Sequence, residues 1–446
     1  MVLPAQTTLT ENVPTAVREI ETHGPVATAM RPVIEGSFGS KIPIRFEFWD
    51  GSQLNPPDET VATLKFTSPD AIRRVLWMPN ELGLGRAYVA GELDFDGDLF
   101  DVVTAFRDSK PEVASVGRAW KVLPAAVVAA RRTGALGRPL PPPPEEARLR
   151  GWRHSLKRDA TAIGHHYDVG NDFYRLVLGP TMTYSCARFA QPDFTLEDAQ
   201  TAKHDLICRK LGLHERPGAR LLDVGCGWGS MAIHAAVHYD ARAVGITISK
   251  AQAALARQRV EEAGVNDHVE IRLQDYRDLR GEKFDAISSV GMSEHVGHDK
   301  LDTYFETLRA SLVPQGRLLN HAISSVGGST LGSRSFVGRY VFPDGELIDV
   351  GDTVVAMERA GFEVRDVESL REHYARTLRC WVSNLEVNWD EAVTLVGEPR
   401  AKIWRLYMAG SAVGFEDGGI AIHQVLGVVP SETGDAAMPA TRRDWH

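Results

Sequence analysis

The sequence has little cysteine, no long apolar run and no excess of positive charge. The four cysteines of the 446-residue chain are far apart and form no C-x-x-C pair, so we expect neither a disulfide framework nor a metal site. No run of about eighteen apolar residues occurs, which argues against a membrane-spanning segment. The formal net charge of -9 argues against a general nucleic-acid binder. The N-terminus has charged residues and no apolar core, so we expect no signal peptide and a cytoplasmic protein.

The composition is that of an ordinary globular chain with more than one domain. Hydrophobic residues make up 43% and charged residues 24%, and the length predicts two or three domains. Local patterns divide the chain into a mobile arm over 1–30, a smaller α+β domain over 31–137, a Pro-rich basic linker over 138–158, a larger domain over 159–430 and a tail over 431–446.

The smaller N-terminal domain contains no group of residues that would perform chemistry. Ile42–Trp49 and Val61–Thr67 alternate like strands, and Asp70–Trp77 has helical periodicity. Residues 118–132 are apolar with basic ends, and they form either a core helix or a helix that lies in a membrane interface. The domain is therefore a packing or dimerisation module, which leaves a homo-oligomer open, or a module that docks on lipid.

One decapeptide, Leu221–Ser230, is the centre of the larger domain. It reads LLDVGCGWGS, which is a short apolar strand followed by glycines at every second position, and an apolar segment comes next. Gly225 and Gly227 allow a tight turn and let a ligand lie against bare main chain. The spacing differs from that of a dinucleotide site, and the lysine of a P-loop is missing. With Asp223 at the end of the strand, the pattern indicates a cationic cofactor, S-adenosylmethionine (SAM), rather than a pyrophosphate.

Strands and helices alternate after this motif. Strands are expected over Ala243–Ile248, His268–Leu273, Phe284–Val290, Gly316–Ile323, Phe362–Val367 and Ile420–Val429, with helices over Lys250–Glu262 and Leu301–Leu312. This alternation predicts an α/β fold with a doubly wound, mostly parallel seven-stranded sheet of the Rossmann-like type found in class I SAM methyltransferases. Such sheets bind ligands beyond the carboxyl ends of their strands, so motifs at those ends should converge.

Polar residues at the strand ends are candidates for cofactor contacts. The second strand ends without the carboxylate that often holds a ribose, and Thr247 and Gln252 are the polar groups available there. Asp275 follows the third strand, where it could accept a hydrogen bond from an adenine amino group, and Tyr276 could stack on the ring. The alternative for each of these residues is an ordinary polar residue of the surface.

Eight motifs in a fixed order give the larger domain a specific resemblance. They lie between about Asp159 and Val429 and read HHYDVGNDFY, MTYSCARF, LLDVGCGWG, GITIS, QDYRDL, GMSEHVG, FPDGEL and HYARTLRCW. The series resembles the cyclopropane-fatty-acid synthase family, which includes the mycolic acid methyltransferases. The N-terminal domain is similar to that of the long members, some of which make a methylene branch rather than a ring.

The resemblance implies a SAM site that draws on several of these motifs. The cofactor contacts would be Tyr167, Tyr184, Ser185, Asp223, Gly225, Cys226, Gly227, Thr247, Gln252, Gln274, Asp275 and Tyr276. An insertion over about 324–385 would build the acyl tunnel, and its apolar wall would contain Phe336, Tyr340, Phe342 and Trp381.

The same resemblance implies a bound bicarbonate that removes a proton from the transferred methyl group. Its ligands would be the main chain of Ile323 and four side chains, those of Cys186, Glu294, His321 and Tyr374. An anion here would also offset the positive charge of the sulfonium and of a carbocation. Asn320 departs from the family, in which an apolar residue is expected beside the histidine, and we expect it to alter strand packing.

The implied activity is methyl transfer from SAM to the double bond of an unsaturated fatty acyl chain. The chain would belong to a phospholipid, and the enzyme would act peripherally at the inner face of the membrane. The carbocation leads either to a cyclopropane ring or, after a hydride shift, to a 10-methylene product that a partner reductase would saturate. The alternatives are a methyltransferase for another lipid or a small polar molecule, and an inactive lipid-binding homologue.

Overall fold

The computed structural model describes residues 20–39, 41–57, 59–109, 116–147, 169–328, 335–343 and 345–445, without side chains at 116–121, 444 and 445. The chain divides into two compact units, Met1–Trp77 with Gly91–Leu140 and Met78–Ala90 with Pro141–His446. Tyr167, residues 1–19 of the expected arm and residues 148–158 of the expected linker lie outside the described residues.

The first unit is a mixed five-stranded sheet with helices. Its strands follow the order β1 (Glu21–His23), β3 (Gln53–Asn55), β2 (Ile44–Phe48), β4 (Ala62–Phe66) and β5 (Leu93–Gly97). Its helices are α1 (Pro25–Phe38), α2 (Pro69–Trp77), α4 (Leu99–Asp108) and α5 (Val116–Arg132). Every second residue of β2 and β4 is buried, so the alternation in the sequence sets which face of the sheet is covered.

The second unit contains a doubly wound sheet. Its strands follow the order β12 (Glu363–Ser369), β13 (Ile420–Val428), β10 (Leu312–Ser325), β9 (Phe284–Val290), β6 (Arg220–Val224), β7 (Arg242–Thr247) and β8 (Val269–Leu273), and the short β11 (Ile348–Asp349) adds to β10. β13 runs antiparallel to β10 and β12, whereas the remaining pairs are parallel. The mostly parallel seven-stranded sheet that the sequence predicts is confirmed.

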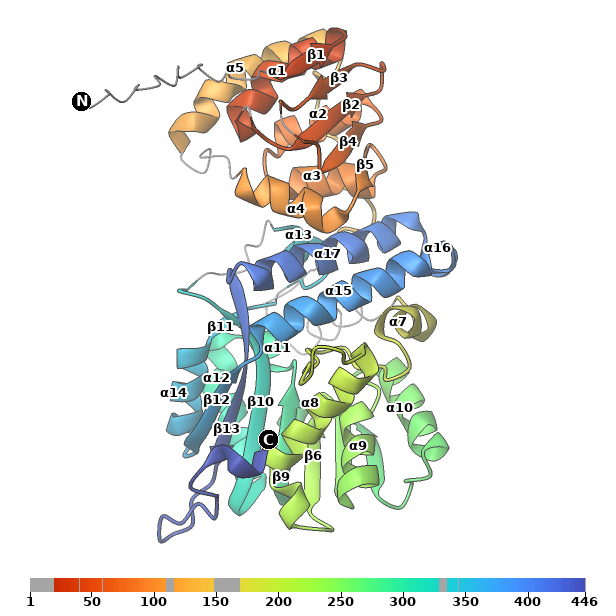
Figure 1. Cartoon of the computed structure of the whole chain (residues 1–446). Coiled ribbons are helices and arrows are strands. Elements are labelled where there is room, and N and C mark those ends of the chain that lie inside the picture. The colour runs from red at the N-terminus through yellow and green to blue at the C-terminus, as the bar shows by residue number, and fades with distance from the viewer. Residues whose placement is uncertain are drawn as a thin grey trace, which may run out of the picture. The chain divides into compact units, whose positions relative to one another are not determined.

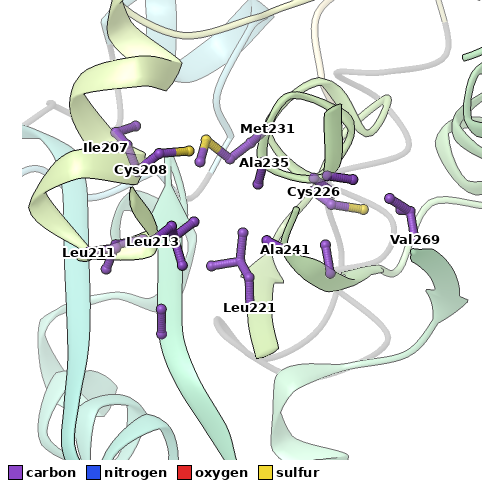
Figure 2. Packing of buried hydrophobic residues seen from close by; sticks show 14 of the residues in the cluster. Ile207, Cys208, Leu211, Leu213, Leu221, Cys226, Met231, Ala235, Ala241 and Val269 are labelled. Carbon is purple, nitrogen blue, oxygen red and sulfur yellow. The ribbon is translucent and has the colours of Figure 1, made fainter. Parts of the chain in front are cut away.

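Helices cover both faces of this sheet. One face carries α8 (Leu196–Lys210), α9 (Ser230–Tyr239) and α10 (Lys250–Glu262), and the other carries α12 (Leu301–Ala310) and α14 (Val350–Arg359). Leu221 and Leu222 are adjacent on β6, and each is fully buried on a different face. Figure 2 shows Leu221 among side chains of α8 and α9, including Ile207 and Met231. Burial on both faces explains why the strands are almost continuously apolar.

A further layer of helices lies at the carboxyl end of the parallel strands. Its members are α7 (Asn171–Leu178), α11 (Ser293–Val296), α13 (Phe336–Tyr340), α15 (Arg371–Val387), α16 (Trp389–Val396) and α17 (Glu398–Glu416). Figure 1 shows α15 and α17 side by side across the end of the sheet at which β9 and β10 terminate. The bounds of this layer differ from the insertion expected over 324–385. Within that range α14 packs on a face of the sheet and β12 is a strand of it, while the helices of the layer continue to Glu416.

Three elements, β1, α1 and α3, differ from the division that the sequence suggests. β1 and α1 begin inside the expected arm, because Ile20 and Met30 are buried in the first unit. α3 (Glu81–Val89) belongs to the second unit, where it packs against α13 and α17. Gly85 allows this approach, since a Cβ at that position would lie 2.3 Å from the ring of Phe336. Within the described ranges, no helix is long and apolar enough to cross a membrane.

Candidate functional site

The loop after β6 presents bare main chain to a cavity. The N–H groups of Gly225 and Cys226 both donate to the carbonyl of Ile246 at 3.0 Å, which fastens the loop to the end of β7. Gly225 has a φ of 74°, and a Cβ at this position would lie 2.3 Å from the sulfur of Met292. Any other residue here would be strained by the positive φ and would have to displace the Met292 side chain.

The cavity beside this loop is partly open to solvent, and its empty space, counted together with the solvent at the open side, is about 1170 Å³. All the described residues that were expected to contact the cofactor line it, namely Tyr184, Ser185, Asp223, Gly225, Cys226, Gly227, Thr247, Gln252, Gln274, Asp275 and Tyr276. They come from the carboxyl ends of β6, β7 and β8, from the start of α10 and from the segment before α8. The topology therefore brings these motifs together, while the contact that each residue makes with a cofactor stays a prediction.

Asp223 places a buried carboxyl group in the cavity wall. Its Oδ1 accepts a hydrogen bond from the hydroxyl of Ser288 at 2.7 Å, and its Oδ2 has no hydrogen-bond partner among the described residues. Burial raises the pKa of this carboxyl to about 6. An unpartnered buried acceptor is costly, so this oxygen suits a ligand that brings a positively charged donor.

The end of β7 is organised by hydroxyl and amide groups in place of a carboxylate. Thr247 donates from its hydroxyl to Gln252 Oε1 at 2.9 Å and accepts from the N–H of Ser249 at 3.2 Å. Ser249 caps α10, because its side chain accepts from the N–H of Gln252. These bonds fix the orientation of Gln252 at the place where a ribose would lie in the predicted complex.

Asp275 is already engaged by a neighbouring arginine. Its two carboxylate oxygens accept from Arg277 Nε at 2.9 Å and Nη2 at 2.8 Å, and its Oδ1 also accepts from the N–H of Arg277. The pKa of Asp275 is lowered, because these hydrogen bonds outweigh desolvation, which acts in the opposite direction. The Arg277 guanidinium also lies over the ring of Tyr276. A contact between Asp275 and adenine must therefore use lone pairs that Arg277 leaves open.

Several residues of the cavity wall escaped the sequence analysis. They are Lys203, His204, Arg277, Met292 and His295. Lys203 had an available signal, because it shares a helical face with the buried Leu196, Ala199 and Ile207, where a charged residue is unusual. His204 lies in contact with Lys203 Nζ, and no local sequence pattern indicates this contact.

Glu294 on α11 is bonded directly to β10. Its Oε1 accepts from the N–H of Ile323 at 2.7 Å, and its Oε2 has no partner in the described part of the chain. Burial raises the pKa of Glu294 to about 7. The carboxyl group can therefore gain or lose a proton near neutrality. The Ile323 N–H that the resemblance offers to bicarbonate donates here to Glu294.

His321 on β10 is a buried neutral imidazole. Its Nδ1 lies 3.1 Å from the amide nitrogen of Gln424, which can only donate, so Nδ1 accepts and Nε2 carries the hydrogen. Nε2 has no hydrogen-bond partner among the described residues. Burial lowers the pKa of His321 well below its usual value, and the charges of Lys203 and Lys210 act in the same direction. The residue is thus a neutral donor that an anion could use.

Cys186 and Tyr374 are both hydrogen-bonded to Leu370, at the beginning of α15. The thiol of Cys186 is buried and lies 3.6 Å from the carbonyl of Leu370, the residue before the helix, and Tyr374 follows one turn later. The N–H of Leu370 donates to Ile422, which pairs with Ile323 across β10 and β13. These links place the expected catalytic residues around the end of β10 and the start of β13, while their catalytic roles stay predictions.

Asn320 does not disturb the sheet. It pairs in register with Ser289 on β9, and its Oδ1 accepts from Ser289 Oγ at 3.2 Å and Ser293 Oγ at 2.8 Å. The expected change in strand packing is not seen, because both of these hydroxyl groups satisfy the buried amide oxygen. Ser293 precedes Glu294, so Asn320 anchors the short helix that carries this carboxyl group.

The sheet order, the glycine loop and the acidic residue at the end of β6 together define a SAM-dependent methyltransferase of class I. The residues present fit this cofactor, because the bare loop and the unpartnered oxygen of Asp223 converge on one cavity.

Comparison with known proteins gives the family. The model of the mycolic acid cyclopropane synthetase family matches residues 154–425. A probable fatty acid methyltransferase of Mycobacterium tuberculosis is 42% identical over 90% of this chain and 94% of its own length. The cyclopropane-fatty-acyl-phospholipid synthase of Escherichia coli is 39% identical over 60% of this chain and 68% of its own length. The chain belongs to the mycolic acid cyclopropane synthetase family.

Solved structures agree with this assignment. The crystal structure of the mycolic acid cyclopropane synthase CmaA1 complexed with SAH and CTAB superposes with a TM-score of 0.57 at 35% sequence identity. The match covers 60% of this chain and 98% of that chain.

Proposed function

We propose that this enzyme transfers the methyl group of SAM to the double bond of an unsaturated fatty acyl chain of a phospholipid. The observation that carries the proposal is the aromatic cluster at the edge of the cofactor cavity, in which the buried Trp381 and Trp404 pack behind Tyr184. Tyr184 lines the cavity, and its ring centroid lies 5.2 Å from that of Trp381 and 5.8 Å from that of Trp404. Aromatic faces stabilise a developing carbocation and suit an apolar chain. A small polar substrate would need polar ligands instead.

The relatives support the same substrate class. The proteins matched above act, by their names, on fatty acids, on fatty acyl chains of phospholipids and on mycolic acids. All of these are long acyl chains. An inactive lipid-binding homologue is opposed by the glycine loop and by the presence of both Glu294 and His321 in the buried part of the domain.

Proton removal is the second half of the proposed reaction. Glu294 Oε2 and His321 Nε2 are buried and unpartnered among the described residues, so they fit an anion that carries one proton. Bicarbonate would be held by these two groups together with the thiol of Cys186 and the hydroxyl of Tyr374, and it would supply the base for the methyl proton. Glu294 would have to release the N–H of Ile323 if that group also served the anion.

The product is a cyclopropane or a 10-methylene acyl chain, because both arise from the same cation. Immediate loss of a methyl proton closes the ring. A prior hydride shift gives the exocyclic methylene, which a partner reductase would convert to a methyl branch.

The test is product analysis by NMR with a defined dioleoyl phospholipid and SAM. Cyclopropane methylene protons or exocyclic vinylidene protons on the acyl chain would support the proposal and identify the product. Methylation of the headgroup, or no methylation of any unsaturated lipid while small amines are methylated, would contradict it. A saturated phospholipid is the matched control and should remain unmodified.

We further propose that α5 brings the enzyme to a membrane surface. Ala129 and Ala130 of α5 are buried, while Leu123, Val127 and Val128 are exposed. Two arginines follow in the last turn of the helix. An apolar exposed face with a basic end suits the interface of an anionic bilayer.

A further inference from the structure

Helix α8 carries two buried lysines with opposite surroundings. Lys210 Nζ lies 2.9 Å from an oxygen of Asp366 and 2.5 Å from an oxygen of Glu368, so its charge is paired twice. Lys203 lies two turns earlier and is 1% exposed, yet no carboxylate oxygen of the described residues lies within 4 Å of its Nζ. This second lysine lines the cofactor cavity.

Two of the three N–H donors of Lys203 face neutral groups, and the third has no hydrogen-bond partner among the described residues. Its Nζ donates to Ser185 Oγ at 3.0 Å and lies 3.0 Å from His204 Nε2. His204 must be neutral to accept this bond, and burial together with Lys203 holds the pKa of His204 well below its usual value. A buried ammonium without a counter-ion is costly, so this position requires an anion or a neutral amine.

Other titratable groups around Lys203 are electrostatically coupled to it. Cys186 and Asp223 favour its charged form, whereas burial, the larger effect, lowers the pKa of Lys203 to about 7. Burial also keeps Cys186 as a thiol by raising its pKa, and His321 is neutral on the neighbouring strand. Asp223 is therefore the only one of these neighbours that is ionised near neutrality, and it is too distant to pair with the amine.

The methionine end of SAM carries one carboxylate and one ammonium group. The cavity wall offers one buried acid, Asp223, and one buried amine, Lys203, that do not pair with each other. We propose that Lys203 is the counter-ion of the cofactor carboxylate, and that cofactor binding draws a proton onto Lys203. This inference rests on SAM as the cofactor and is independent of the acyl substrate.

The sign of the proton exchange follows from this geometry. A carboxylate beside the amine favours its charged form, so the pKa of Lys203 rises when the cofactor binds. Proton uptake therefore occurs above pH 7 and below the raised pKa, and cofactor affinity falls as the pH rises through this window. Asp223 is already ionised there, because its pKa is about 6, and His204 remains neutral.

The test is calorimetric titration of the full chain with S-adenosylhomocysteine at about pH 8 in buffers of different ionisation enthalpy. Wild type should take up close to one proton more than Lys203→Met, and the variant should bind roughly 10- to 100-fold more weakly. The amino group of the ligand titrates in the same way in both proteins, so the difference isolates Lys203. Lys402→Met removes another buried lysine, which pairs with Glu398 on α17, and should leave both quantities unchanged.

A second ligand distinguishes the loss of the carboxylate contact from a general disturbance of the fold. Methylthioadenosine lacks the carboxylate and the ammonium group, so wild type and Lys203→Met should bind it equally well. Equal weakening of both ligands would show a structural role and overturn the proposal. Unchanged affinity and proton count for S-adenosylhomocysteine in Lys203→Met would overturn it as well, while leaving the proposed methyl transfer intact.

Discussion

Gly225 lines the cofactor cavity at a position where a side chain would be strained. Its φ of 74° is one that other residues adopt at a cost, and the sulfur of Met292 fills the space where a Cβ would lie. Gly225→Ala should therefore weaken S-adenosylhomocysteine binding roughly 10-fold or more while leaving the fold in place. Calorimetric titration measures the affinity, and circular dichroism reports on the fold.

Gly264 provides the matched control for this substitution. It also has a positive φ, 68°, but no atom lies within 4 Å of the position that a Cβ would take. Gly264→Ala should carry the conformational cost without a change in affinity. If Gly225→Ala bound the ligand as tightly as wild type, the loop would not be the cofactor site.

Glu294 gives the reaction a dependence on pH. Because burial raises its pKa to about 7, the carboxylate form is populated only as the pH rises through neutrality. We expect kcat/KM to rise about tenfold per pH unit below this pKa and to level off above it. Glu294→Gln should lower turnover by about 10²–10⁴-fold and abolish the rise of kcat/KM with pH, with little effect on SAM affinity. His321→Ala should lower turnover by a similar factor. Initial rates across the pH range measure both effects.

Removing bicarbonate tests whether the base that takes the methyl proton is bicarbonate or Glu294 itself. Removal of bicarbonate should slow wild type and have much less effect on Glu294→Gln, whose site is already impaired. A wild type that runs at full rate in rigorously bicarbonate-free buffer would assign the base role to Glu294 itself.

Among the elements, α8 links local sequence to the site most directly. Thr195 Oγ1 accepts from the N–H of Asp198 at 3.1 Å, and the Asp198 carboxylate accepts in return from the N–H of Thr195 at 3.2 Å. This capping box fixes the start of the helix that carries Lys203.

The cap makes α8 testable as an element. Thr195→Ala should release the first turn and speed hydrogen exchange of the Asp198 amide by roughly 2- to 30-fold, which corresponds to the usual cost of losing a cap. Thr195→Ser keeps the hydroxyl and should exchange like wild type. Equal exchange in all three proteins would mean that packing, rather than the cap, holds this end of the helix.

At the scale of the whole molecule, two units share one chain. The mycobacterial fatty acid methyltransferase matches 90% of the chain, whereas the Escherichia coli cyclopropane synthase matches 60%. A match over 90% of the chain must include most of the first unit, so the exposed apolar residues of α5 are best tested in the intact protein.

Binding to vesicles tests the proposed role of α5. The full chain should bind anionic vesicles and release them as salt rises to about 1 M, where the Debye length is roughly 3 Å. Replacing Val127 and Val128 together by glutamate should weaken binding severalfold, because the apolar contact is lost and negative charge is added. Val387→Glu alters another exposed valine and should bind like wild type. Sedimentation with vesicles measures the bound fraction, and salt-independent binding to neutral vesicles would contradict the proposal.

The sequence by itself determined the features that depend on short-range pattern. The strand and glycine loop over Leu221–Ser230, the helix over Lys250–Glu262 and the strand over Phe284–Val290 could be predicted because periodicity and backbone freedom are local properties. The family motifs likewise indicated the residues that line the cofactor cavity, since parallel strands bring their carboxyl ends to one edge.

Only the tertiary structure decided which distant groups meet. Three features depend on contacts between residues far apart in the chain: the place of α3 in the second unit, the bond from Ile323 to Glu294, and the surroundings of Lys203, in which no described carboxylate pairs with the amine. Lys203 and Lys210 have the same residue type and lie on the same helix, and no local pattern reveals that one faces two carboxylates and the other a cavity. Burial and pairing set the charge of such groups, and both are properties of the folded chain.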